Sequence, residues 1–115
     1  MKVELDYKFQ NLNDMITSSR GSKYKANTVK QREKHFVKLN TLTVPKITEY
    51  PVKIDVIWHV KNKCFDLDNK IVKSILDGLV EARILKNDNF NCINEINYKA
   101  VVDGNEKVEL ILTKN

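Results

Sequence analysis

A regular alternation of apolar and polar side chains follows Pro51 and constrains the fold of this 115-residue chain more than any other feature. Successive side chains of a β-strand point to opposite faces, so a period of two indicates a strand with one buried face. The alternation therefore predicts a strand over residues 51–61. The apolar residues at every second position are Val52, Ile54, Val56, Trp58 and Val60.

Two other segments carry apolar residues at helical spacing. Val29, Phe36 and Val37 predict a basic amphipathic helix from about Tyr24 to Leu42, which ends before Pro45. A wider apolar stripe follows residues 66–69 and predicts a second helix. Its members are Ile71, Val72, Ile75, Leu76, Leu79 and Val80.

Alternating patterns at both ends of the chain predict three further strands, over residues 2–9, from Ile93 to Val102, and through Val108 to Leu112. Asp103-Gly104-Asn105 is a tight-turn signal and predicts that the last two strands form a hairpin. The polar composition of residues 10–22 predicts a loop with one helical turn at residues 14–18. The order β-α-β-α-β-β predicts an α+β fold with a mixed, mainly antiparallel sheet, in one domain over residues 1–115.

Composition excludes several classes of protein. No apolar run reaches the roughly 18 residues that a membrane span needs, and the alternating first residues do not form the apolar region of a signal peptide. With 42% hydrophobic residues, three glycines and two prolines, the chain is neither disordered nor repetitive. Two cysteines, Cys64 and Cys92, do not make a disulfide framework and favour small buried thiols. We expect a soluble, cytoplasmic protein.

The net charge of +5 is unevenly distributed. Residues 1–65 carry 13 basic and 6 acidic residues, whereas residues 66–115 carry 7 and 9. Between Met15 and Lys46, the sequence contains many basic residues and a single acidic residue, Glu33. This stretch suits a phosphate backbone, although a solvated helix face gives the same pattern. The basic residues are Arg20, Lys23, Lys25, Lys30, Arg32, Lys34, Lys38 and Lys46.

Three carboxylates flank the second predicted helix. Asp66 and Asp68 follow the strand over residues 51–61, and Asp88 precedes the next strand. If these two strands are neighbours, the three acids meet at one edge of the sheet. Such a group binds a hard cation such as Mg²⁺, which orients a water molecule and polarises a phosphodiester. Lys73 or Lys70 would then neutralise the transition-state phosphate.

Other interpretations of these residues stay open. Asp66, Asp68 and Asn69 lie where a helix begins, so they can instead cap its free N–H groups. A calcium loop is excluded, because its required glycine and glutamate positions hold Ile71 and Asp77. The two histidines, His35 and His59, have no partner at metal-ligand spacing and fit structural or surface positions.

The ordered set of motifs resembles the RusA-type Holliday-junction resolvases. The resemblance lies in Asp66-Leu67-Asp68-Asn69, in the helical stretch from Lys73 to Leu79, and in the turn from Ile84 to Asn89. It continues through Glu95-Ile96, and upstream in Asn11-Leu12-Asn13-Asp14 and the stretch from Arg20 to Lys30. It thus covers most of the chain.

The resemblance implies a homodimeric, Mg²⁺-dependent endonuclease, encoded by phages or prophages, that resolves four-way DNA junctions by paired nicks in recombination and repair. Mn²⁺ is a possible substitute cation. Asp66, Asp68 and Asp88 match the family's metal-binding catalytic carboxylates, and Lys73 matches its catalytic lysine.

Two positions depart from the family's pattern. Asn87 replaces the first acid of the usual pair, and an extra residue separates Asn69 from Lys73, which leaves Lys70 or Lys73 for the phosphate. Asp77 matches a recurrent family acid, or forms an ion pair with Lys73 one helical turn away.

The expected DNA contacts come from basic and aromatic residues. Phe65 either stacks on an unpaired base or packs at the end of the strand. The basic members of the set are Arg20, Lys23, Lys25, Lys30 and Lys70. Three alternative functions are a branched-DNA-binding module without catalysis, a general metal-dependent nuclease, and a structural protein whose carboxylates only cap a helix.

Overall fold

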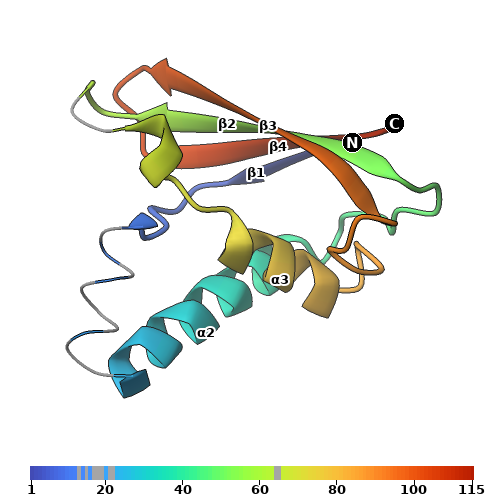
Figure 1. Ribbon diagram of the computed structural model, residues 1–115, viewed down its shortest axis with the longest axis horizontal. Helices are drawn as coiled ribbons and strands as arrows, with labels where there is room; N and C mark the ends of the chain where they lie inside the picture. Colours follow the sequence, from blue (N-terminus) through green and yellow to red (C-terminus); the bar gives the residue numbers. More distant parts are fainter. Residues whose placement is uncertain (13, 15, 17–19, 21–22, 64–65) are drawn as a thin grey trace.

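The computed structural model describes residues 1–12, 14, 16, 20, 23–63 and 66–115, with the side chains of residues 23–26 and 68 outside the description. Figure 1 shows one four-stranded sheet with two α-helices packed against one of its faces. The predicted α+β class, the mixed sheet and the element order are confirmed. The elements are β1 (Lys2–Leu5), α2 (Lys23–Asn40), β2 (Val52–Val60), the 3-10 helix η1 (Leu67–Asn69), α3 (Lys73–Glu81), β3 (Ile93–Val102) and β4 (Lys107–Lys114).

The strand order in the sheet is β1-β4-β2-β3. β4 pairs antiparallel with β1 and β2, whereas β2 and β3 pair in parallel. The predicted hairpin between the last two strands is therefore wrong. The turn itself is present, with Gly104 at φ 81°, but it carries the chain past the end of β2, where the Asp103 N–H donates to the Val60 carbonyl at 3.2 Å. A turn signal marks where a chain reverses, not which strand it then pairs with.

The core lies between the sheet and the two helices. Every second side chain of β2, from Val52 to Val60, is buried, as the alternation predicts. Val108, Leu110 and Leu112 of β4 are buried beside them, and α3 contributes residues such as Ile75 and Leu79. In the described part of the chain, no helix is long and apolar enough to cross a membrane.

Two predicted boundaries differ from the structure because tertiary packing replaces local regularity. β1 ends at Leu5, not at residue 9, yet Phe9 is buried and packs on Tyr7, with ring centroids 4.7 Å apart. α3 begins at Lys73, because Lys70 is extended (φ −80°, ψ 139°). Val72 of the predicted apolar stripe is buried although it precedes the helix. The predicted helical turn at residues 14–18 lies largely outside the described residues.

Helices α2 and α3 approach each other closely at Gly78. A Cβ atom built there would lie 2.6 Å from the Cβ of Val37 and 3.1 Å from the Lys34 carbonyl oxygen. Real Cβ atoms do not approach another carbon this closely. Only glycine therefore permits the observed distance between the helices, and this contact fixes where α3 lies.

We expect Gly78→Ala to lower the free energy of unfolding by about 1–2 kcal/mol, because the overpacking cost exceeds the gain in helix propensity. Urea denaturation measures the change, with Gln31→Ala on the exposed side of α2 as the control. In a Val37→Gly background, which removes both the Cβ and the Cγ atoms that the new methyl group would meet, Gly78→Ala should cost less. An equal cost in both backgrounds would contradict the assigned contact.

Candidate functional site

Asp66 lies at the corner after β2, in extended backbone (φ −101°, ψ 133°), with an exposed side chain. Its carboxylate makes no capping hydrogen bond to η1. The residue before α3 is Val72, which has no side-chain cap either. The capping interpretation is therefore wrong for Asp66. The side chain of Asp68 lies outside the description.

Lys73, the first residue of α3, contacts two carboxylates. Its Nζ lies 3.0 Å from Asp88 Oδ2 and 3.1 Å from Asp77 Oδ1. The hydrogen bonds to Asp88 and then Asp77 raise the pKa of Lys73. The predicted ion pair with Asp77 is confirmed. Exposed ion pairs of this kind contribute at most about 1 kcal/mol, so the cluster is not needed for folding.

The strand pairing does not bring the three predicted carboxylates to one edge. β2 and β3 are neighbours, as the prediction required, but they run parallel. The end of β2, which leads to Asp66, and the start of β3, which follows Asp88, therefore lie at opposite ends of the sheet (Figure 1). Asp88 instead lies beside α3, where it contacts Lys73.

Among the side chains that the structure describes, no three His, Cys, Asp or Glu residues form a group that could hold a metal ion. The side chain of Asp68 is not among those described. The donor chemistry still fits Mg²⁺ or Mn²⁺, because Mg²⁺ keeps several waters and needs only one or two carboxylates. The carboxylate of Asp66 makes no capping hydrogen bond to a helix, and the side chain of Asp88 is 29% exposed.

The buried carboxylate of Glu33 contacts Ser74, the residue after Lys73, and the sequence analysis did not predict it. Glu33 of α2 is 1% exposed and accepts hydrogen bonds from the Gln10 backbone N–H (2.7 Å) and from Ser74 Oγ (2.9 Å). Burial raises the pKa of Glu33. Its spacing could have revealed it, since Glu33 stands four residues from both Val29 and Val37, within the apolar stripe of α2.

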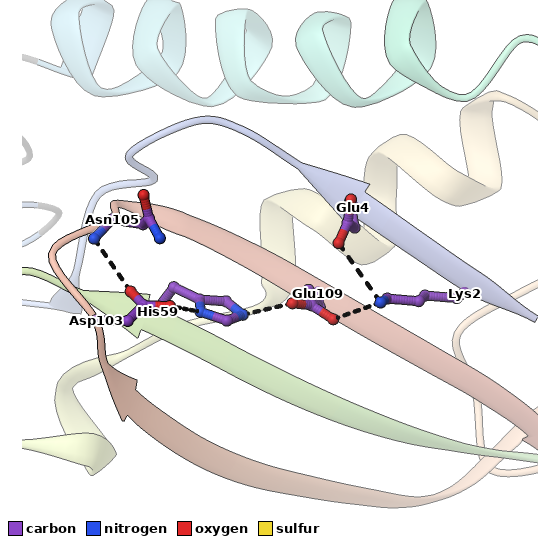
Figure 2. A network of polar contacts seen from close by, with 6 residues as sticks. All are labelled: Lys2, Glu4, His59, Asp103, Asn105 and Glu109. Carbon is purple, nitrogen blue, oxygen red and sulfur yellow. Dashed lines mark hydrogen bonds and ion pairs between the residues drawn. The ribbon is translucent and has the colours of Figure 1, made fainter.

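His59 takes part in a polar network on the sheet face opposite the helices (Figure 2). Its Nδ1 contacts Asp103 and its Nε2 contacts Glu109, while Lys2 Nζ lies 3.1 Å from Glu109 and 3.5 Å from Glu4. The bond to His59 lowers the pKa of Asp103, and the bond to Lys2 lowers that of Glu109. The network joins β1, β4 and β2, which agrees with a structural position for His59.

The predicted DNA-contacting residues are in different environments. Arg20 and Lys30 are exposed. Lys70 is half-buried, with its Nζ 5.8 Å from the ring centroid of Trp58. The side chains of Lys23 and Lys25 lie outside the description, as do Phe65 and Cys64. Elsewhere in the basic stretch, Lys34 forms an ion pair with Glu81 at 3.1 Å.

The second cysteine, Cys92, is buried as predicted.

Comparison of the sequence with protein-family models and with curated proteins finds no match.

The raised pKa of Glu33 gives a pH dependence with a definite sign. The folded protein holds the Glu33 proton more tightly than the unfolded chain does. This contribution to stability is full below the unfolded pKa and is lost as pH rises through the folded pKa. We therefore expect the free energy of unfolding to fall as pH rises between the unfolded and the folded pKa of Glu33. Glu33→Gln should remove this fall, because glutamine keeps an acceptor oxygen without the charge.

Urea denaturation at a series of pH values measures this effect, with the exposed Glu49→Gln as the control. Glu33→Ala should lower stability by about 2–4 kcal/mol, because it opens a cavity and leaves two donors unpaired. The same pH slope in wild type and Glu33→Gln would contradict the assignment.

Proposed function

We propose that this protein is a divalent-metal-dependent endonuclease that acts on branched DNA and resolves four-way junctions, as a homodimer, in recombination and repair. One observation carries the proposal. Lys73 and Asp88, which stand 15 residues apart and both belong to the ordered motifs, are in contact in the folded chain, at 3.0 Å.

The carboxylates on either side of α3 are suited to phosphodiester chemistry. Asp66 and Asp68, which follow β2, would hold Mg²⁺ together with water molecules, and the ion when bound would polarise the phosphodiester and orient a water molecule. The exposed carboxylate of Asp66 supports this role, because it makes no capping hydrogen bond to η1. Asp88, which contacts Lys73 beside α3, would orient the lysine.

Lys73 would neutralise charge that develops on the phosphate. Its side chain is 69% exposed, and the hydrogen bonds to Asp88 and Asp77 raise its pKa, which favours the charged form. Asp77 and Asp88 restrain its ammonium group at the first turn of α3. Lys70 is less suited to this role, since burial and the charge of Lys8 lower its pKa.

Helix α2 supplies positive charge for the DNA backbone. Lys30, Arg32 and Lys38 are exposed along it. Contacts of this type position DNA without reading its sequence, so junction recognition would depend on the shape of the DNA. Two symmetric cuts would require two active sites, which a homodimer provides.

A second candidate is a branched-DNA-binding module without catalysis. It is favoured by the absence of a three-carboxylate group among the described side chains and by Asn87, which replaces an acid beside Asp88. Cleavage assays separate the two candidates.

We expect the purified protein with Mg²⁺ to make paired nicks in a synthetic four-way junction, and EDTA to stop the reaction. Asp68→Asn and Lys73→Met should each reduce the cleavage rate by about 100-fold or more, because each removes charge that stabilises the transition state. Gel assays with end-labelled strands measure cleavage, and mobility shifts measure binding. Binding should persist in Asp68→Asn.

Asp55→Asn is the matched control, because Asp55 lies on β2, where it contacts Lys53 and Asn97, and has no contact with Lys73. Junction binding without cleavage under any divalent metal would favour the binding module. Equal cutting of duplex, single-stranded and branched DNA would favour a general nuclease.

A further inference from the structure

A cavity of about 250 Å³ lies at the end of the sheet where β2 ends and β4 begins. Residues 7–9, which follow β1, form another part of its wall. None of the residues considered above for catalysis, apart from Lys70, lines this cavity. Its lining combines aromatic rings with lysine side chains.

Tyr7, Phe9 and Trp58 form the aromatic part of the wall. The ring of Tyr7 packs 4.7 Å from Phe9 and 4.6 Å from Phe36, and Trp58 packs edge-on against Tyr98 at 5.9 Å. These neighbours hold the rings in place before any ligand arrives. Trp58 and Phe9 are buried, at 5% and 6% exposed, so the half-buried ring of Tyr7 provides the aromatic surface that a flat unsaturated ring such as a nucleobase can contact.

The rest of the wall is strongly basic. Lys8, Lys61, Lys70 and Lys107 line the cavity, and Glu106 is the one acid among the lining residues that the structure describes. Glu106 lies 4.0 Å from Lys8 and 3.8 Å from Lys61, so two lysines share one carboxylate. Burial, and then the positive charge of Lys8, lower the pKa of Lys70. Excess positive charge at this density favours an anion.

The size of the cavity restricts the ligand. Pockets for drug-sized ligands have volumes of roughly 300–1,000 Å³, so about 250 Å³ accommodates one nucleobase and little more. Inorganic phosphate would satisfy the lysines but leave the aromatic wall unused. A nucleotide satisfies both parts of the wall.

The cavity lies next to the acidic corner, which is the segment after β2 that contains Asp66 and Asp68. Lys61 and Lys70 of its wall stand on either side of the segment that contains Asp66. A nucleotide in the cavity would therefore place the adjoining DNA strand near this corner.

We propose that the cavity binds one unpaired nucleotide of a DNA strand, with the base against Tyr7, close to Trp58 and to the Lys70 ammonium group that lies over the Trp58 ring, and the phosphate among the lysines. The assignment to DNA, and not to a free nucleotide, rests on the proposed function. The chemistry of base and phosphate is common to both sources.

The fluorescence of Trp58 tests the proposal in the full-length protein, because this residue is the sole tryptophan. The probes are a single-stranded tetranucleotide, thymidine 5′-monophosphate and inorganic phosphate. We expect a saturable change with the tetranucleotide, and weaker binding, by about tenfold, when Lys8→Gln and Lys107→Gln are combined. Lys99→Gln, exposed on β3 and outside the cavity wall, should bind as wild type does.

Parallel junction-cleavage assays separate this inference from the proposed function. No fluorescence change with either nucleotide probe, in a protein that cuts junctions, would overturn the cavity assignment alone. A saturable nucleotide response in a protein that cuts no DNA would uphold the cavity and overturn the nuclease. An equal response to inorganic phosphate would overturn base recognition. Equal affinity for the mononucleotide and the tetranucleotide would overturn the assignment to DNA.

Discussion

The buried carboxylate of Glu33 holds together the elements on which the candidate site depends. It joins α2 to the segment after β1, through the Gln10 N–H, and to α3, through Ser74. Ser74 is the neighbour of Lys73, so this buried bond helps to determine where Lys73 lies. The close contact at Gly78 also helps to position Lys73, because it sets the distance between α2 and α3. The position of Lys73 against Asp77 and Asp88 thus depends on buried interactions with α2, and not on the exposed ion pairs themselves.

The end of β2 determines where the segment that contains Asp66 and the lysine-lined cavity lie. Because β2 is central, with β4 on one side and β3 on the other, its last residues meet the turn after β3 and the start of β4. The chain then enters the segment that contains Asp66. The acidic corner and the lysine-lined cavity therefore share one end of the sheet, whereas α3 and the segment after it supply Lys73 and Asp88. Under the proposed function, this arrangement would let a DNA strand bind beside the carboxylates proposed to hold a cation.

The sequence predicts the elements well, because their patterns are local. The alternation in β2, the apolar stripe of α3 and the turn at Gly104 are each visible within a few residues. It does not predict the pairing of β4 with β2, which depends on the whole sheet, nor the contacts of His59 with residues 44 and 50 positions away. Among site residues, the Lys73–Asp77 pair follows from helical spacing, whereas the Lys73–Asp88 contact depends on how the chain folds back after α3.

We propose that Asp66 and its neighbouring carboxylates hold a divalent cation and do not cap a helix. Calorimetric titration of the protein with Mn²⁺ measures this binding, with Asp66→Asn as the test variant and Asp55→Asn as the control. We expect saturable heat in wild type and in Asp55→Asn, and loss of that heat in Asp66→Asn. Absence of metal binding in wild type, or undiminished binding in Asp66→Asn, would contradict this proposal.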